Sequence, residues 1–219
     1  MSSVMEWLQK IDAQLFHLIN SELSHPWLTS FFVFITNLHH QKIFTWGVLP
    51  VVILTWWWFK RNHAIKVLIV LGLVAGLCDS LSYRTLKPGI GRLRPHQLAA
   101  VQAQQAADNK AFQAPIVRVP YWPKSFSFPS NHALTGFALA RLITWYHPTA
   151  HIWAWLVVSL VAYSRVYVGV HYPGDVIGGA LIGWLIASIL IKWVISGFYF
   201  LLPIYGYKSS RKMWGKAKD

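Results

Sequence analysis

Residues 176–191 read VIGGALIGWLIASILI, a stretch without a single charged side chain. Apolar residues fall on every side of a helix drawn through this stretch, and it lacks the period-two alternation of a half-buried strand. A helix needs about 20 mostly apolar residues to cross the hydrocarbon core of a bilayer. The stretch reaches that length with its flanking residues, so it predicts a transmembrane α-helix.

Three other apolar runs, at 47–59, 64–78 and 152–162, carry almost no charge. The whole chain is 55% hydrophobic and only 12% charged, with a mean hydropathy of +0.39, which is too apolar for an ordinary soluble domain. Transmembrane β-strands would alternate in hydropathy, and these runs do not. We therefore expect an all-α, polytopic membrane helix bundle with about six transmembrane helices, at 27–38, 43–59, 64–86, 130–146, 152–170 and 175–201.

We expect one membrane domain over 1–219, with three segments outside the spans. Residues 1–25 are predicted to form an N-terminal amphipathic helix lying in the membrane interface, although an ordinary packed helix fits the pattern equally well. Residues 87–129 are predicted to be a long extracytoplasmic loop, in which the Ala/Gln-rich segment 96–113 has helix-forming composition. Residues 207–219 are predicted to be a basic cytoplasmic tail. The apolar face of the N-terminal helix would contain Met5, Leu8, Ile11, Leu15, Leu18 and Ile19.

The net charge of +13 is distributed unevenly along the chain. Lys60, Arg61 and Lys66 flank one connector, and the tail is basic, which is the pattern of cytoplasmic anchoring. A second group of cations lies in or beside connectors on the opposite face, where it opposes the usual orientation bias. The simplest reason for that group is a bound anion. Its members are Arg84, Lys87, Arg92, Arg94 and Arg165.

The 13 tryptophans, including three in succession at 56–58 beside Lys60, are typical of an interfacial aromatic belt and not of a platform for stacking bases. We expect no nucleic acid partner. The single cysteine, Cys78, lies in an apolar run and is predicted to be a small buried side chain. Asp79 next to it is an intramembrane acid that fits a functional or a structural role about equally.

Two short motifs precede the fourth predicted span. Residues 87–95, KPGIGRLRP, place cations after the third span, with two glycines that allow a tight turn around a phosphate. Residues 125–133, SFSFPSNHA, end at the start of the fourth span, where Ser130 is a suitable N-cap. The backbone N–H groups of Asn131 and His132 then point off a helix N-terminus, which is a seat for an anion.

A third motif, residues 164–175, SRVYVGVHYPGD, lies between the fifth and sixth spans. Pro173 suits the first turn of the sixth helix. Asp175 follows His171 by four residues, a spacing that lets the carboxylate hold one ring nitrogen of the imidazole.

Histidines, cations and an aspartate on one membrane face fit phosphoryl transfer. That chemistry needs positive charge on the equatorial oxygens, an in-line nucleophile and an acid for the leaving oxygen. A metal-dependent hydrolase with His132, His171 and Asp175 as ligands is an alternative, although the surrounding cations would repel a divalent ion. A non-enzymatic channel or transporter is a further alternative, but the charged residues lie at span ends and no broken pair of spans is apparent.

The three motifs resemble the signature of the type 2 phosphatidic acid phosphatase superfamily, the lipid phosphate phosphatases that share a site with vanadium haloperoxidases. The signature is Lys-x6-Arg-Pro, then Pro-Ser-Gly-His, then Ser-Arg-x5-His-x3-Asp. It is matched here in order and spacing, with Asn131 in place of glycine. The matching residues are Lys87, Arg94 and Pro95, then Pro129, Ser130 and His132, then Ser164, Arg165, His171 and Asp175.

The resemblance implies a metal-independent hydrolase without a cofactor. By this resemblance His171 is the nucleophile that becomes phosphohistidine, Asp175 orients it, and His132 protonates the leaving group. Lys87, Arg94, Arg165 and Ser130 hold the phosphoryl oxygens, and Asn131 contributes to the same phosphate site. Asn is the mildest replacement for a glycine in a left-handed conformation, so we expect activity to survive.

The resemblance also bears on the lipid substrate, and the charge pattern bears on which membrane face the motifs occupy. Such a family acts on undecaprenyl diphosphate, phosphatidylglycerophosphate, phosphatidic acid or lipid A phosphates, and the compact form resembles bacterial members that act on undecaprenyl diphosphate or a broad range of lipid phosphates. If Lys60 and the tail are cytoplasmic, the parity of the spans places all three motifs on the outer face of the bacterial inner membrane.

Overall fold

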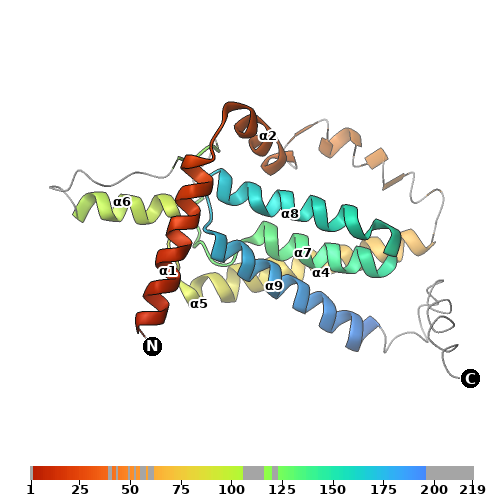
Figure 1. Ribbon diagram of the computed structural model, residues 1–219. Helices are drawn as coiled ribbons and strands as arrows, with labels where there is room; N and C mark the ends of the chain where they lie inside the picture. Colours follow the sequence, from red (N-terminus) through yellow and green to blue (C-terminus); the bar gives the residue numbers. More distant parts are fainter. Residues whose placement is uncertain are drawn as a thin grey trace, which may run out of the picture.

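The computed structural model describes residues 2–38, 41, 42, 44–48, 50, 51, 53, 54, 58, 62–105, 116–119 and 123–195. Within these residues the secondary structure is helical and contains no strand, which confirms the all-α prediction. Figure 1 shows a bundle of long helices with the N-terminal helix crossing one of its ends. The basic tail, the Lys60–Arg61 pair and seven residues of the predicted span 43–59 lie outside the described residues; that span includes a π-helical turn, η3 (Phe44–Val48).

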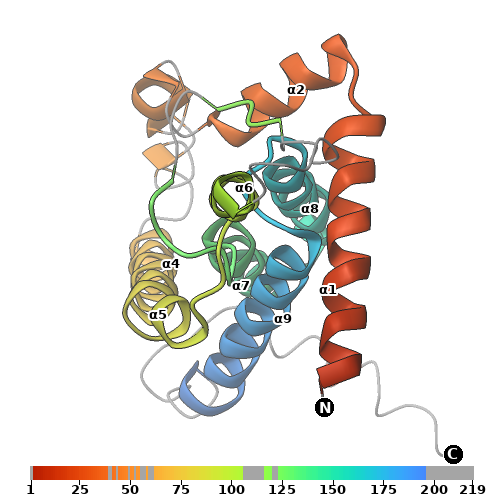
Figure 2. The same ribbon diagram turned by 90° about the vertical axis from the view of Figure 1, so that its left-hand side faces the viewer.

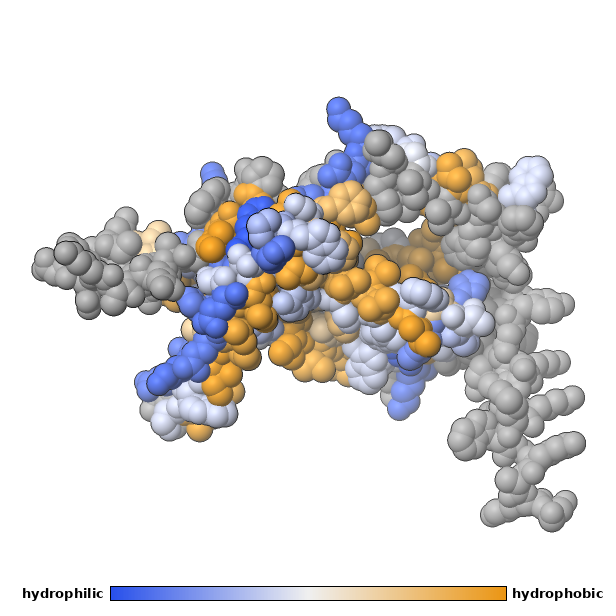
Figure 3. Space-filling view, turned by 45° about the horizontal axis from the view of Figure 1, so that its top comes forward, coloured by the Kyte–Doolittle hydropathy of each residue, from blue (hydrophilic) through white to orange (hydrophobic). Residues whose placement is uncertain are grey.

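The N-terminal helix α1 (Ser2–His17) continues into a π-helical turn, η1 (Leu18–Glu22), so the helix predicted for this region is present. Met5, Leu8, Leu15 and Leu18 of its predicted apolar face are exposed. Figure 3 shows hydrophilic and hydrophobic residues side by side along this helix. An exposed apolar stripe is what a helix in the membrane interface would present to lipid.

A short helix, α2 (Pro26–Thr36), follows and packs on the end of the bundle. His25 ends the preceding turn, and its ring accepts a hydrogen bond from the backbone of Trp27, which caps the helix. Phe32 contacts the rings of Tyr163 and Tyr167 at centroid distances of 5.0 and 4.8 Å. These contacts hold α2 against the C-terminal end of the helix that carries Arg165.

The predicted third span is helix α4 (Asn62–Leu81), continued by η4 (Ser82–Leu86) and α5 (Lys87–Ile90). A loop was predicted to begin at residue 87, but the helix continues for one more turn, to Ile90. Pro88 is tolerated because it lies in the first turn of α5. The helix ends at Gly91, whose φ of +63° is a conformation that glycine adopts without strain. A further helix, α6 (Pro95–Gln105), lies in the Ala/Gln-rich segment.

Three helices form the core of the bundle: α7 (Asn131–Tyr146), α8 (His151–Tyr167) and α9 (Pro173–Ile189), the last extended by η6 (Leu190–Ile195). A turn of 3-10 helix, η5 (Pro148–Ala150), joins α7 to α8. Figure 2 shows α7 in the middle, with α4, α8 and α9 around it. The largest hydrophobic cluster joins α4, α7 and α9 around Leu134, Ala138 and Leu142, so α7 is the central element.

Within the described part of the chain, two stretches are long and apolar enough to cross a membrane: Val67–Ala100, with 34 residues, and Pro173–Lys192, with 20. The first of them includes the non-helical residues 91–94 between α5 and α6. They coincide with the third and sixth predicted spans. The count of six crossings stays a prediction. Helix α7 has 16 residues and α8 has 17, which is just below and at the lower limit of about 17 residues for a spanning helix.

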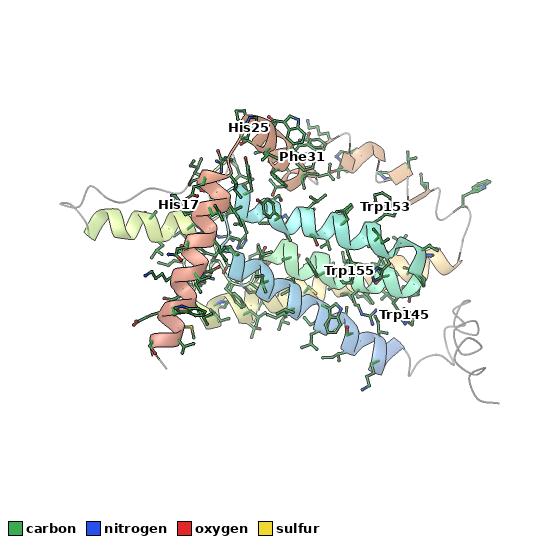
Figure 4. All side chains as sticks on the ribbon, viewed as in Figure 1. His17, His25, Phe31, Trp145, Trp153 and Trp155 are labelled. Atoms are coloured by element: carbon green, nitrogen blue, oxygen red, sulfur yellow. The ribbon has the colours of Figure 1, made fainter. Side chains whose placement is uncertain are left out.

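Three tryptophans of α7 and α8 lie toward the end of the bundle away from α1. Figure 4 places Trp145, Trp153 and Trp155 toward that end, and His17 and His25 at the other. Trp153 is exposed. An exposed tryptophan near a helix end agrees with the interfacial belt expected from the sequence.

The close approach of α7 and α9 yields a stability prediction. A Cβ atom on Gly183 would lie 2.0 Å from the backbone oxygen of Leu134, whereas one on Gly76 of α4 would meet nothing within 4 Å. Overpacking costs about 1–3 kcal/mol, so we expect Gly183→Ala to lower the melting temperature in detergent by about 2–12 °C. Gly76→Ala is the matched control and should not lower it, because alanine favours a helix more than glycine does. Equal melting temperatures for the two variants would contradict this account of the α7–α9 contact.

Candidate active site

The three motifs meet at the end of the bundle where α7 and α9 begin and α8 ends. The backbone N–H of Ser130 donates to the carbonyl oxygen of Asp175 at 3.0 Å, which joins the second motif to the third. The N–H of Ser127 donates to the carbonyl oxygen of Arg92 at 2.7 Å, which joins the second motif to the first. Segments about 40 residues apart in sequence are therefore bonded through their backbones, which leaves little freedom in the positions of their side chains.

His171 lies in the connector between α8 and α9 and is only 2% exposed. Its Nδ1 lies 3.4 Å from Oδ2 of Asp175, as the four-residue spacing predicted, and its Nε2 lies 3.1 Å from Nη1 of Arg94. A guanidinium group has donors only, so Nε2 must accept from it and carries a lone pair. The proton of the neutral ring is then on Nδ1, facing the carboxylate.

Burial lowers the pKa of His171 to about 3. The adjacent carboxylate of Asp175 opposes this shift, while the nearby positive charges of Arg94 and Arg165 add to it. The imidazole is therefore neutral at physiological pH, which a nucleophilic nitrogen requires.

Asp175 is completely buried at the start of α9, and four groups surround its carboxylate. The backbone N–H of Tyr172 donates to Oδ2 at 2.8 Å, and the hydroxyl of Ser127 donates to the same oxygen. Nη1 of Arg92 donates to Oδ1 at 2.8 Å. With His171 as the fourth neighbour, the carboxylate is held in one orientation.

Two cations of the first motif lie beside this pair and are nearly buried. Arg94 donates from Nε to the carbonyl of Ser125 at 2.7 Å and from Nη1 to the carbonyl of Val170 at 2.7 Å. Lys87 donates from Nζ to the carbonyl oxygens of Phe126 and Pro129, at 2.7 and 3.1 Å. Neutral carbonyl oxygens orient these cations without cancelling their charge, so the site is electropositive.

The third cation, Arg165, is 3% exposed near the end of α8. Its Nη1 donates to the hydroxyl of Thr36, a buried residue at the end of α2. The packing of α2 on α8 therefore has a direct effect on the position of a predicted phosphate-binding residue.

The predicted N-cap is at Ser130, but its side chain makes no capping hydrogen bond. Among the described residues, the buried hydroxyl of Ser130 has no hydrogen-bond partner. A buried hydroxyl without a partner is costly, and an anion at the N-terminus of α7 would satisfy it. His132 occupies the first turn of the same helix and is half-buried.

Asn131 was predicted to contribute to the phosphate site, but its side chain makes hydrogen bonds to α4 and η4 instead. Its Oδ1 accepts from the hydroxyl of Ser82, and its Nδ2 donates to Asp79 at 3.1 Å, so the amide bridges α7 to α4. Thr135 also lies within 3.4 Å of Asp79. Only the backbone N–H of Asn131 is therefore placed to contribute to an anion site. The structural interpretation of Asp79 was an ion pair with a loop arginine, whereas the partners seen are the uncharged side chains of Asn131 and Thr135 on α7.

Sequence reasoning missed three residues that shape the site: Asp12, Ser127 and Thr36. Arg92 was included among the anion-binding cations, but it contacts carboxylates instead. One signal could have found Asp12. The chain has 7 acidic residues against 20 basic ones, so each acid is a candidate partner for a buried arginine.

Most of the chain matches a known protein family. A family model described as the PAP2 superfamily matches residues 63–198. A lipid A 4'-phosphatase of Porphyromonas gingivalis is 26% identical over 193 residues, which cover 86% of this chain and 75% of that protein. A putative undecaprenyl-diphosphatase, YbjG, of Escherichia coli is 28% identical over 199 residues, which cover 87% of this chain and 86% of that protein.

A solved structure shares the fold. The crystal structure of a transmembrane PAP2-type phosphatidylglycerolphosphate phosphatase from Bacillus subtilis matches with a TM-score of 0.57, over 86% of this chain and 87% of that one, at 24% identity. The helical bundle is thus one that a transmembrane phosphatase adopts. Since the family model covers more than half of the chain and its motifs converge on one buried site, this protein belongs to the PAP2 superfamily, with lipid phosphatases among its relatives.

Proposed function

We propose that the protein is a membrane lipid phosphatase that hydrolyses a phosphate or diphosphate headgroup through a phosphohistidine at His171. The observation that carries this proposal is the state of the imidazole. Its Nε2 lone pair faces Arg94, its other nitrogen faces Asp175, and its pKa of about 3 keeps it neutral. A neutral, oriented nitrogen beside buried cations is suited to attack an anionic phosphoryl group.

The reaction has two steps. Nε2 of His171 attacks phosphorus in line, the bond from phosphorus to the leaving oxygen breaks, and His132 gives that oxygen a proton. Water then attacks the phosphohistidine, with His132 taking a proton from it, and the phosphorus–nitrogen bond breaks to release phosphate. Asp175 stabilises the positive charge that the ring carries while it is phosphorylated.

The equatorial oxygens of the phosphoryl group would be bound by Lys87, Arg94 and Arg165, together with the N-terminus of α7. The unpartnered hydroxyl of Ser130 supports this assignment. It also requires some rearrangement, because Arg94 contacts His171 Nε2 in this structure. An incoming anion would take over that hydrogen bond and expose the lone pair.

An apolar groove supports a lipid substrate. A cavity of about 450 Å³ between α7 and α8 is lined by apolar residues that include Gly136, Ala140, Val157 and Val161. Gly136 lies one helical turn beyond His132, and Val161 one turn before Arg165, so the groove continues the helix faces that carry these two residues. A lipid with its phosphate at His171 can lay its hydrocarbon chain along this groove.

The proposed substrate is undecaprenyl diphosphate or a broad range of lipid phosphates. This proposal is supported by the similarity to a putative undecaprenyl-diphosphatase over most of both chains and by the groove described above. Phosphatidylglycerophosphate and lipid A phosphates are the alternatives, the latter favoured by the similarity to a lipid A 4'-phosphatase. Lipid preference in a purified-enzyme panel would decide among them.

The other classes of function fit the site less well. In a metal-dependent hydrolase His171 would be a ligand, but its two nitrogens already face Arg94 and Asp175, and positive side chains would repel a divalent ion. In a transporter, a neutral nucleophile and an unpartnered serine would have no evident role.

Trapping the intermediate tests the function and the roles of the histidines. With terminally ³²P-labelled undecaprenyl diphosphate and excess chelator, the wild type should form an acid-labile phosphoenzyme. His171→Ala should form none, and His132→Ala should turn over about 10²–10⁴ times more slowly while still labelling. Phosphatidylglycerophosphate and lipid A serve as comparison substrates. Labelling of His171→Ala would refute the nucleophile assignment, and loss of activity with chelator, restored by zinc or magnesium, would support the metal-dependent alternative.

The lowered pKa of His171 predicts a pH-dependent stability. Between the ordinary pKa of 6.5 and the folded value of about 3, the unfolded chain binds a proton that the folded protein excludes. This residue therefore makes the wild type less stable as the pH falls through that range. His171→Gln lacks this penalty, so its melting temperature relative to the wild type should rise as the pH is lowered from about 7 to about 4.5. A difference that stays constant with pH would contradict a neutral, buried His171.

We also propose that the site faces the outer side of the inner membrane, as the charge pattern predicts. Lys124 is exposed in the segment before α7, and Thr149 is exposed in the turn at the other end of that helix. On a Cys78→Ala background, Lys124→Cys should react with a membrane-impermeant thiol reagent outside spheroplasts. Thr149→Cys should react only after permeabilisation, and the reverse pattern would overturn the orientation.

A further inference from the structure

The N-terminal helix was expected to lie in the membrane interface, yet one of its faces contacts the active site. Asp12, Phe16 and Asn20 follow one another at four-residue spacing, so they share a face of the continuous helix formed by α1 and η1. Figures 1 and 2 show α1 crossing the end of the bundle where α8 ends and α9 begins. Each of the three residues contacts the third motif or a segment next to it.

Two of these residues fix the helix in place. The ring of Phe16 packs on the ring of Tyr172 at a centroid distance of 5.3 Å. Asn20 is fully buried and donates from Nδ2 to the carbonyl oxygens of Tyr167 and Ile116, each at 2.9 Å. Buried hydrogen bonds to backbone groups set the position of α1 relative to the end of α8.

Asp12 precedes these two anchors along the helix and contacts the start of α9. Its Oδ1 accepts a hydrogen bond from the backbone N–H of Gly174 at 2.7 Å, in the first turn of α9. Its Oδ2 accepts from Nη2 of Arg92. A Cβ atom at position 174 would lie 2.9 Å from this carboxylate, so the close approach depends on glycine. The Asp12 side chain is only 13% exposed, so water screens this ion pair weakly.

Arg92 divides its guanidinium between two carboxylates. Nη2 contacts Asp12, Nη1 contacts Oδ1 of Asp175 at 2.8 Å, and the group lies 4.3 Å from the ring centroid of Tyr172. An arginine with one carboxylate partner prefers to bind it through two parallel hydrogen bonds. Asp12 prevents that arrangement by occupying the second nitrogen.

This division matters for Asp175, because its two oxygens have different partners. Oδ1 binds Arg92, while Oδ2 receives Ser127 and Tyr172 and lies nearest Nδ1 of His171. If Arg92 engaged both oxygens, it would compete with the imidazole for Oδ2 and neutralise more of the carboxylate. His171 would then lose part of the support that its ring needs when it becomes positively charged.

We propose that Asp12 is a positioning residue of the active site, acting through Arg92 on the Asp175–His171 pair. The proposal rests on the proposed phosphohistidine mechanism. It gives the N-terminal helix a part in catalysis: α1 supplies the carboxylate that keeps Arg92 from closing on Asp175.

Kinetics of the full-length enzyme test this role. Asp12→Ala should lower kcat about 10- to 100-fold, by analogy with the loss of groups that orient a site residue from behind, while KM changes less than about twofold because Asp12 touches no substrate. Asp12→Asn keeps an oxygen for the N–H of Gly174 but loses the charge, so a smaller loss of kcat is expected. This variant also covers the case in which Asp12→Ala fails to fold. Glu6→Ala, on an exposed part of the same helix, is the control and should behave as the wild type.

A double-mutant cycle separates positioning from simple stabilisation. If Asp12 acts through Arg92, the Asp12→Asn substitution should change kcat by less than about threefold in an Arg92→Met background. The same loss in both backgrounds, a wild-type kcat for Asp12→Asn, or a rise in KM alone would overturn the proposal.

Measuring the wild type in parallel separates a failure of the proposed function from a failure of the proposed role of Asp12. If the wild type hydrolyses none of the lipid phosphates, the proposed function fails, and the role of Asp12 fails with it. If the wild type is active and Asp12→Asn is equally active, only the role of Asp12 is refuted.

Discussion

The buried carboxylate of Asp175 is the constraint on which the rest of the site depends. A charge with no exposed surface must be compensated, and removing a partner from a buried ion pair costs about 3–5 kcal/mol. Its neighbours come from separate parts of the chain: Arg92 after α5, Ser127 before α7, and His171 and Tyr172 before α9. Satisfying one carboxylate therefore brings all three motifs together at the start of α9.

The same arrangement explains why the site is suited to a phosphate. Arg92 is paired with carboxylates, whereas Lys87 and Arg94 are held largely by neutral carbonyl oxygens and keep their charge for a ligand. His171 stays neutral between these cations and Asp175. A dianionic phosphoryl group entering the site would balance the excess positive charge and the unpartnered hydroxyl of Ser130.

The sequence was sufficient to predict the helical architecture, the approximate bounds of α4, α7, α8 and α9, and the pairing of His171 with Asp175, because apolar runs and i, i+4 spacing are local properties. It was insufficient for contacts that depend on packing. The continuation of the third helix to Ile90 was missed because glycines and Pro88 suggested a loop. The bridge from Asn131 to Asp79 and the contact of Asp12 with Arg92 join segments 52 and 80 residues apart, and no local pattern encodes such pairings.

A structure of the enzyme with bound vanadate tests the central claim most directly, because vanadate adopts the five-coordinate geometry of a phosphoryl group in transfer. We predict that vanadium is bonded to Nε2 of His171, with Nδ1 still facing Asp175. The equatorial oxygens should be surrounded by Lys87, Arg94, Arg165 and Ser130. Vanadate bonded to His132 or to a metal ion, or Arg94 still bonded to Nε2 with the anion elsewhere, would contradict it.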